Sequence, residues 1–418
     1  MTIQALLQQT KQAARVLRRA PIETRNEALL RIADAITKNA AEILAANERD
    51  MDNASSISAA LRDRLKLTPE RIENMATALT EVASQQDPLG SHRELGSGRS
   101  GIRVTRRRIP LGVIGIVYEA RPNVTAECAA LTIKSGNAVV LRGGKEAINS
   151  NRCIAKLVQS ALSASKLPPA CVTFIDDTDR QSVKELLEAT KYVDLLIPRG
   201  GGGLMRVVDE LARVPVIRHG QGICHVFIDE HAASEMAVEI AHNAKVQRPG
   251  VCNAMETLII HEKRLQDCLV PLAKRLADSG VSMCADSTSL RVLSENGINA
   301  RIATSEDWDT EFLGLTLAIR TVGGLREACD HISEHGTHHT ASIITEDQNA
   351  AEHFLADVDA SCVMWNASTR FNDGGELGLG AEMGISTSKM HAYGPMSATE
   401  LTTEKLVVYG SGQTRGGA

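Results

Sequence analysis

A ten-residue segment, QRPGVCNAME at positions 247–256, contains the residue types that covalent catalysis requires. Its cysteine, Cys252, follows a Pro-Gly turn and precedes a strand-like apolar run. A thiol on such a turn is accessible, and a nearby cation such as Arg248 favours the reactive thiolate. Most free cysteines are small core residues. Here the turn and the flanking Arg248 and Asn253 instead favour a nucleophile.

A second candidate group follows the buried strand expected at 112–118, where the chain reads EARPN. Polar groups at the carboxyl end of such a strand are where a doubly wound fold binds its ligands. Asn123, the last residue of this run, could donate its amide N–H to a developing oxyanion. It could equally be an ordinary helix N-cap. The residues alone leave both interpretations open.

Two further strand ends have features of a nucleotide site. Arg142 and Lys145 flank two glycines, and basic side chains at such a position suit a ribose 2′-phosphate rather than a free 2′-hydroxyl. The glycine run 200–203, with Gly201 and Gly202, offers backbone N–H groups to a phosphate at a helix N-terminus. The alternative for the segment with Arg142 and Lys145 is a solvated loop, and the alternative for the glycine run is a flexible loop. At none of these strand ends is there the GxGxxG spacing of ordinary dinucleotide sites.

Two polar segments lie later in the chain. The histidines of 331–339 have no Cys or carboxylate spacing that completes a metal site. We therefore expect no metal and assign this segment a structural or substrate-contact role. The loop 366–376 follows an apolar strand and includes Arg370 and Asp373. Its amide, guanidinium and carboxylate groups suit a zwitterionic amino-acid substrate.

A regular frame must position these residues. From residue 112 onward, short apolar strands alternate with helices, which predicts doubly wound parallel sheets in an α/β fold. Residues 3–86 read as helices, one of which is expected to start at Thr68-Pro69. The Gly-punctuated alternation over 94–109 predicts a projecting hairpin, and the run 214–217 is one of the expected strands. A second α/β unit is expected to start near Cys252, and the tail 402–410 predicts one more strand.

Composition narrows the function classes. The chain has 418 residues, 43% of them hydrophobic and 23% charged, which is typical of a soluble enzyme of two or three domains. A net charge of −5 and 3% aromatic residues argue against a nucleic-acid partner. Nine scattered cysteines without a CxxC pair indicate reduced thiols in the cytoplasm. No apolar run is long enough to predict a membrane span, and the N-terminus lacks the pattern of a signal peptide.

Taken together, these segments resemble the aldehyde dehydrogenase superfamily, and within it the branch that forms glutamate 5-semialdehyde. QRPGVCNAMETL with ARPN upstream is the most specific part of the match. The matching blocks, which span about 106–388, are RRRIPLGVIGIVYEARPNVT, SGNAVVLRGGKEA, LLIPRGGGGL, NAKVQRPGVCNAMETLI, EFLG and WNASTRFNDGGELGLGAEMGIST.

The resemblance implies an aldehyde-dehydrogenase-like fold with two doubly wound parallel-sheet domains and a small β flap for homo-oligomerisation. It assigns Cys252 as nucleophile, Asn123 as oxyanion donor and Glu311 as the contact to the nicotinamide ribose. The expected domains are a cofactor-binding domain at 1–93 and 111–246, a catalytic domain at 247–384, and a flap at 94–110 and 385–418.

The implied activity is NADPH-dependent reduction of L-glutamyl 5-phosphate to L-glutamate 5-semialdehyde and phosphate, a step of proline biosynthesis, through a cysteine thioester. Arg121 and Arg370 are candidates for the substrate's phosphate or carboxylate, and glutamate 5-kinase is a further expected contact.

Two alternatives remain open. One is a hydrolytic NAD(P)-dependent aldehyde dehydrogenase of the same fold, and the other is a non-catalytic protein that kept the fold. Hydrolytic members activate water with the glutamate of a Glu-Leu-Gly-Gly motif. The corresponding stretch here, IRHGQG at 217–222, has no carboxylate, which favours the reductive activity.

Overall fold

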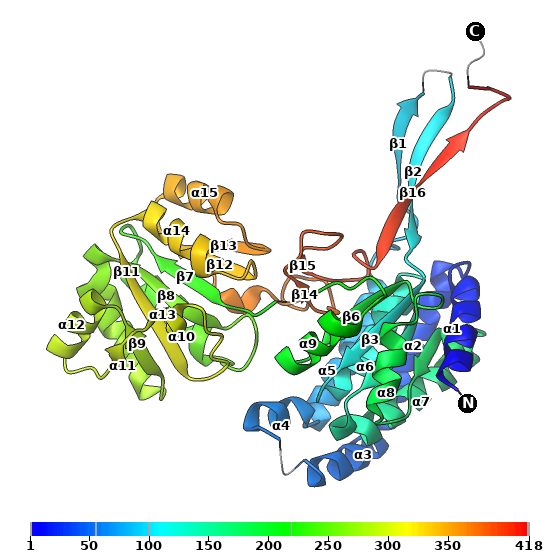
Figure 1. Cartoon of the computed structure of the whole chain (residues 1–418), viewed down its shortest axis with the longest axis horizontal. Helices are drawn as coiled ribbons and strands as arrows, with labels where there is room; N and C mark the ends of the chain where they lie inside the picture. The colour runs from blue at the N-terminus through cyan, green and yellow to red at the C-terminus, as the bar shows by residue number, and fades with distance from the viewer. Residues whose placement is uncertain (1, 55–56, 99–100, 219, 416–418) are drawn as a thin grey trace.

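The computed structural model describes residues 2–54, 57–98, 101–218 and 220–415. It contains two α/β bodies and a narrow antiparallel ribbon that projects from one of them (Figure 1). The predicted fold class, parallel α/β sheets with a small β flap, is confirmed.

The first body is built on a four-stranded parallel sheet in the order β5-β4-β3-β6. Its central strands β3 and β4 are buried along their whole length, as expected for a sheet covered on both faces. The chain runs from β3 through β4 to β5 on one side and places β6 on the other side of β3. The connections therefore change direction between β3 and β6, which opens a ligand crevice at their carboxyl ends. The strands are β3 (Val113–Tyr118), β4 (Ala138–Gly143), β5 (Val172–Phe174) and β6 (Leu195–Arg199).

Helices cover this sheet, and the N-terminal helices pack over them. In α5, the Thr68 hydroxyl accepts the backbone N–H of Arg71 at 3.2 Å and Pro69 occupies the first turn, which confirms the predicted helix start. The helices are α1 (Ile3–Leu17), α2 (Ile22–Lys38), α3 (Ala40–Asp52), α4 (Ala59–Leu65), α5 (Pro69–Ser84), α6 (Pro122–Lys134), α7 (Ile148–Ala164), α8 (Arg180–Leu187) and α9 (Gly202–Leu211).

The second body holds a seven-stranded parallel sheet in the order β10-β9-β11-β8-β7-β12-β13. The strands are β7 (Cys224–Ile228), β8 (Met255–His261), β9 (Ser282–Ala285), β10 (Arg301–Ile302), β11 (Thr316–Val322), β12 (Thr340–Ile344) and β13 (Cys362–Trp365). The helices are α10 (Ser234–Val246), α11 (Val270–Asp278), α12 (Ser287–Glu295), α13 (Ser305–Trp308), α14 (Leu325–His335) and α15 (Gln348–Asp357).

The structure moves the predicted boundary between the cofactor-binding and catalytic domains. Strand β7 pairs with β8 and β12, so it belongs to the second body together with α10. The predicted boundary at 246/247 is therefore wrong, because an apolar strand reads the same whichever sheet it joins. The expected strand at 214–217 makes only an isolated bridge between Val216 and Leu196. The short strands β9 and β10 were not predicted.

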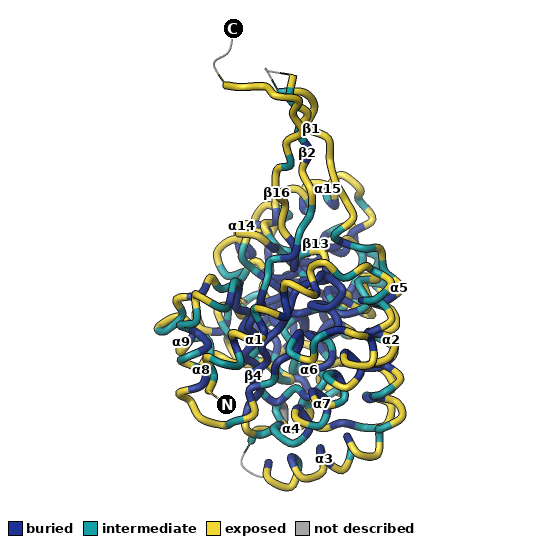
Figure 2. Tube along the Cα trace, turned by 90° about the vertical axis from the view of Figure 1, so that its right-hand side faces the viewer, coloured by how far each residue is buried: buried dark blue, intermediate teal, exposed yellow. Residues whose placement is uncertain are grey.

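The ribbon consists of β1 (His92–Ser97), β2 (Arg103–Pro110) and β16 (Thr402–Tyr409). The early hairpin and the late strand therefore pair with each other, in an antiparallel register that joins Thr402 to Pro110. The ribbon is largely exposed (Figure 2). Residues 99–100 of the predicted hairpin lie outside the described residues.

The segment 385–401 does not join the ribbon, although it was assigned to the flap. It forms its own two-stranded pairing between β14 (Ile385–Ser386) and β15 (Gly394–Pro395). The flap is therefore smaller than predicted.

Candidate active site between the two bodies

Cys252 lies in the turn between α10 and β8, at the amino edge of the seven-stranded sheet, and is half-buried. The first body holds this turn directly. The Arg64 guanidinium donates to the carbonyl oxygen of Gly250 at 2.5 Å, and Arg248 forms an ion pair with Asp63 at 3.2 Å. The nucleophile candidate therefore lies where the two bodies meet.

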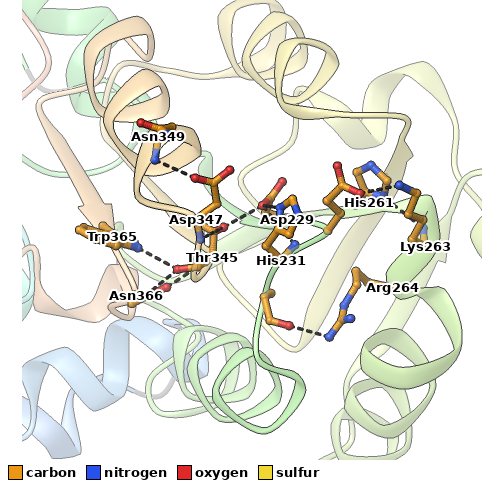
Figure 3. Close-up of polar contacts among 12 residues, drawn as sticks. Asp229, His231, His261, Lys263, Arg264, Thr345, Asp347, Asn349, Trp365 and Asn366 are labelled. Carbon is orange, nitrogen blue, oxygen red and sulfur yellow. Dashed lines mark hydrogen bonds and ion pairs between the residues drawn. The ribbon is translucent and has the colours of Figure 1, made fainter.

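At the carboxyl edge of this sheet, polar side chains form hydrogen bonds with one another (Figure 3). The Thr345 hydroxyl donates to Asp229 at 2.7 Å, and its carbonyl oxygen accepts from the Trp365 indole and the Asn366 amide at 2.9 Å each. These residues follow β7, β12 and β13 at their carboxyl ends. The expectation that a doubly wound sheet binds at its carboxyl edge thus fits the first body, whereas Cys252 lies at the amino edge of the second.

The thiol environment differs from the sequence expectation. Burial raises the pKa of Cys252, and Glu382 raises it further, against the lowering effect of Arg199 and Arg121. Arg248, the cation expected to favour the thiolate, is ion-paired with an aspartate instead. The predicted lowering of the thiol pKa is therefore wrong in this state of the protein.

Three arginines gather beside this thiol. Burial, Arg199 and Arg64 together lower the pKa of Arg121 to about 9. Within the described residues, the Arg121 guanidinium makes no hydrogen bond or ion pair. Cys252 and Glu127 act in the opposite direction, but the Arg121 pKa stays lowered. A half-buried cation beside other cations is costly unless further negative charge joins them. The cluster of Arg64, Arg121 and Arg199 is therefore suited to a ligand with more than one negative charge.

Asn123 lines a cavity of about 210 Å³ next to this cluster, together with Arg64 and Arg248. It is the second residue of α6, where Arg121 is the N-cap, so the interpretation of Asn123 as an N-cap is wrong. One N–H of its amide donates to Glu127 at 2.9 Å. The amide has a second N–H, which leaves one donor for a ligand.

The loop predicted to hold an amino-acid substrate packs against the Cys252 turn. Arg370 donates from its Nε to the side chain of Gln247 at 2.8 Å, and the Asn253 amide donates to the carbonyl oxygen of Asn372 at 2.9 Å. The carboxylate of Asp373 accepts the backbone N–H of Gly375 at 3.0 Å. Arg370 and Asp373 are thus brought to the site together.

Glu311 also reaches this site. Its carboxylate accepts the backbone N–H of Gly222 at 2.9 Å, and burial raises its pKa. Gly222 lies so close to the turn that a Cβ there would be 2.1 Å from the carbonyl oxygen of Cys252. The stretch 217–222 therefore lies beside the nucleophile candidate. His219 of that stretch is outside the described residues.

The expected cofactor residues lie at the carboxyl edge of the first sheet. Gly202 is the first residue of α9 and Gly201 is its N-cap, and the N–H of Gly201 donates to the Glu119 carboxylate at 2.8 Å. Lys145 is exposed after β4. Arg142 is buried, and its guanidinium donates to the carbonyl oxygens of Gly143 at 2.7 Å and Asp179 at 3.0 Å. Of the two basic residues, Lys145 is therefore the one placed to meet a ligand.

A buried ion pair supports the loop that carries Glu311. Lys245 donates to Glu256 at 2.5 Å, both side chains are fully buried, and Glu256 also accepts the backbone N–H of Leu313 at 3.1 Å. Leu313 has a positive φ of 49°, a conformation that a non-glycine residue holds only when its surroundings impose it.

Replacing Lys245 with Met should leave the Glu256 carboxylate buried without its cation. We expect a loss of about 3–5 kcal/mol in the free energy of unfolding, measured by urea denaturation. The paired variant K245M/E256Q should recover part of this loss. A stability of K245M equal to that of the parent would contradict the role of the pair.

Several residues near Cys252 were not singled out from the sequence. Arg199 belongs to a quoted block and follows a predicted strand, so its position was a usable signal. Glu382 also belongs to a quoted block, and His339 to the histidine segment 331–339, but neither was placed beside Cys252. The others come from segments that carry no motif of their own; they are Arg64, Glu127 and Cys224.

The described ranges contain no metal cluster and no membrane-spanning helix. No group of three or more His, Cys, Asp or Glu side chains is arranged to hold a metal ion there. None of the helices in the same ranges combines the length and the apolar character needed to cross a membrane.

Comparison with known proteins places these features in context. Residues 1–289 match the model of the aldehyde dehydrogenase family. The chain is 49% identical to the γ-glutamyl phosphate reductase of Salinibacter ruber over 99% of this chain and 95% of the relative. It is 46% identical to the γ-glutamyl phosphate reductase of Caldanaerobacter subterraneus subsp. tengcongensis, over 99% of this chain and all of the relative.

A solved structure agrees with the fold. The crystal structure of γ-glutamyl phosphate reductase from Thermotoga maritima superposes with a TM-score of 0.92 at 41% sequence identity. The match covers 98% of this chain and 99% of that one. Both bodies and the ribbon are therefore part of a shared architecture.

Proposed function

The chain belongs to the aldehyde dehydrogenase family, and from this membership and its site we propose that it reduces L-glutamyl 5-phosphate to L-glutamate 5-semialdehyde and phosphate. The full-length relatives that carry this activity in their names support the assignment. The reaction is a step of proline biosynthesis.

The single observation that carries this function is the arginine cluster at the nucleophile. Arg121 has no partner within the described residues and lies with Arg64 and Arg199 near Cys252. Glu127 interacts with Arg121 and Arg199, and Glu382 with Arg199, but neither forms an ion pair with these arginines. An acyl phosphate brings further negative charges that the three arginines can bind, whereas a neutral aldehyde brings none.

The Cys252 sulfur attacks the γ-carbonyl carbon of the substrate. The C–O bond to phosphate breaks, and the thiol proton leaves with the phosphate, so the step balances without a separate general acid. This account also fits the raised pKa of Cys252, because the thiol needs no preformed thiolate when the leaving group takes its proton. The product is a thioester on Cys252.

Asn123 and the Cys252 backbone N–H are the donors that hold the oxygen of the reacting carbonyl. A nicotinamide cofactor, which family membership implies, supplies a hydride to the thioester carbon when bound. Collapse of the resulting hemithioacetal then releases the semialdehyde and the Cys252 thiolate, and the thiolate takes up a proton from the solvent to restore the thiol.

The first body has groups that fit such a cofactor. The N-terminus of α9 has no side-chain cap from Gly201, and its Gly201 N–H already binds an anionic oxygen, that of Glu119. Glu311, which belongs to the second body, would hold the nicotinamide ribose. Lys145 is exposed at the end of β4 and suits a 2′-phosphate, which favours NADPH over NADH.

The two ends of the substrate are assigned to different arginines. Arg121, in the cation cluster, would bind the phosphate. Arg370 and Asp373, on the loop that packs on the Cys252 turn, would bind the α-carboxylate and α-ammonium groups.

In the reverse reaction, R121M should raise the KM for phosphate by roughly tenfold or more, because a charge-assisted contact contributes about 1.5–3 kcal/mol. Its KM for semialdehyde should stay close to that of the parent. R370M should show the opposite pattern. Equal effects of both variants on both KM values would contradict the assignment.

The function itself is tested by the reverse assay, which follows reduction of NADP by the semialdehyde with and without phosphate. We expect turnover only with phosphate, and faster turnover with NADP than with NAD. Phosphate-independent oxidation would identify the hydrolytic alternative instead. Absence of any turnover, together with unreactive Cys252, would favour a non-catalytic protein.

We further propose a homo-oligomer, from the exposed ribbon, and a cytoplasmic location, from the free thiols. Leu406 and Val408 are 59% and 56% exposed on β16, an apolar surface that a second copy of the chain would cover in a homo-oligomer. All nine cysteines are free, as expected for a cytoplasmic enzyme. A contact with glutamate 5-kinase would shorten the path of the labile acyl phosphate.

A further inference from the structure

A closed set of hydrogen bonds lies beneath the nucleophile turn. The thiol of Cys224, the first residue of β7, donates to the carbonyl oxygen of Cys252 at 3.1 Å. The same sulfur lies 3.5 Å from Nδ1 of His339, the residue immediately before β12. Both side chains are buried, at 0% and 2% exposure. Neither residue has a part in the chemistry described above.

A second series of hydrogen bonds leads from His339 back to the turn that contains Cys252. Nδ1 of His339 lies 2.7 Å from the hydroxyl of Thr340, and that hydroxyl accepts the Asn372 amide at 2.8 Å. The carbonyl oxygen of Asn372 accepts the Asn253 amide at 2.9 Å. The hydrogen bonds therefore reach two adjacent residues of the turn: Cys224 contacts the carbonyl oxygen of Cys252, and Asn372 contacts the side chain of Asn253.

The Cys224 thiol has a specific task in this set. Arg64 fixes the turn at Gly250, and Asn253 fixes it on the other side. Within the described part of the chain, the Cys224 thiol is the only hydrogen-bond donor to the carbonyl oxygen of Cys252. The tilt of the Cys252–Asn253 peptide, and with it the direction of the nucleophile, depends on this contact.

The residue before His339 has an unusual backbone conformation that its surroundings hold in place. His338 has a positive φ of 58°, which is rare for a residue with a Cβ. Its ring Nδ1 lies 2.8 Å from the carbonyl oxygen of Asp359, and its own carbonyl oxygen accepts the N–H of Ser361 at 2.9 Å. These contacts hold a left-handed residue in place, as is common where a neighbouring side chain has a function.

We propose that Cys224 and His339 are positioning residues for the nucleophile: the Cys224 thiol sets the orientation of the Cys252 peptide, and His339 holds Cys224 in place. The proposal rests on the proposed role of Cys252 as nucleophile. A misplacement of about 1 Å at a reacting atom can cost about 10²-fold in rate, so a contact of this kind affects turnover without touching the substrate.

The test uses the full-length chain with C224A, C224S and a matched control, C284A. Cys284 is also buried in the second body, and its thiol also donates to a backbone carbonyl, that of Leu317 at 3.4 Å. Two rates are measured at one pH: alkylation of Cys252 by iodoacetamide, read by peptide mass spectrometry, and turnover in the reverse assay.

For C224A, we expect both the alkylation rate and kcat to fall by about 10- to 100-fold, as for other supporting contacts around a reactive centre, with the KM for semialdehyde within about twofold of the parent. C224S should recover most of both rates, because a hydroxyl can donate to the same carbonyl oxygen. C284A should match the parent. C224A at parental rates, or C224S as impaired as C224A, would overturn the proposal.

His339→Gln provides an independent measurement. Its effect should not add to that of C224A in the double variant, because both act on one contact. Full additivity would contradict the link between the two residues. If H339Q does not fold, the Cys224 series still decides the outcome.

The alkylation readout separates this proposal from the proposed function. Loss of Cys252 alkylation in C224A, in a protein whose parent shows no phosphate-dependent turnover, would retain the positioning role and reject the reductase activity. Phosphate-dependent turnover that is unaffected by C224A would retain the reductase activity and reject the positioning role of Cys224.

Discussion

Cys252→Ala should abolish phosphate-dependent reduction of NADP by glutamate 5-semialdehyde, with a loss on the order of 10⁴-fold or more. The sulfur is the atom that accepts the acyl group, and a methyl group has no lone pair to replace it. Because Cys252 is only half-buried, the substitution should leave the free energy of unfolding within about 1 kcal/mol of the parent. Steady-state turnover and urea denaturation check both statements.

Cys153→Ala is the matched control, since Cys153 is a half-buried free cysteine of the first body. It should retain parental turnover. A second check uses the parent enzyme trapped with acyl phosphate in the absence of a nicotinamide, where intact-mass analysis should find an acyl group on the peptide that contains Cys252. Near-normal turnover of C252A would end the covalent mechanism.

Asn123→Ala should lower kcat by about 10²–10³-fold, because removal of one oxyanion donor costs about 2.7–4 kcal/mol in the barrier. The KM for semialdehyde should change little, since the donor acts mainly on the charge that develops during reaction. The measurement is the full kinetic profile in the reverse assay with saturating phosphate.

The contact between Asn123 and Glu127 requires its own control. Asn123→Ala also leaves the Glu127 carboxylate without its 2.9 Å donor, so part of the effect could come from that carboxylate. Burial raises the pKa of Glu127, and Glu127→Gln keeps the shape while removing its charge. E127Q should lose far less turnover than N123A. Equal losses in the two variants would show that Asn123 acts by holding Glu127 and not as the oxyanion donor.

The sequence alone predicted the parts of this protein whose signals are local. The Pro-Gly turn with Cys252, the alternation of apolar strands with helices, and the Thr68 helix start each depend on residues a few positions apart. The fold class and the family follow from such segments taken together. Arg121, Asn123 and Arg370 were also named from their local motifs, and Glu311 was named from the family resemblance; their roles stay predictions.

The tertiary structure decided what depends on distant segments. Arg64 contacts Gly250 across a sequence separation of 186 residues, and Cys224 contacts Cys252 across 28. Nothing in the sequence near either residue encodes these contacts. The placement of β7 in the second sheet also depends on distant segments, because the strands that pair with it determine which sheet it joins.

The electrostatics of the thiol shows the same division. Arg248, which lies in the same turn segment as Cys252, suggested a lowered pKa of the thiol, yet Arg248 forms an ion pair with Asp63. Burial and Glu382, which is remote in sequence, raise the thiol pKa. Charge interactions and desolvation depend on distance in space and on exclusion of water, and both are set only when the two bodies and the C-terminal loop pack together.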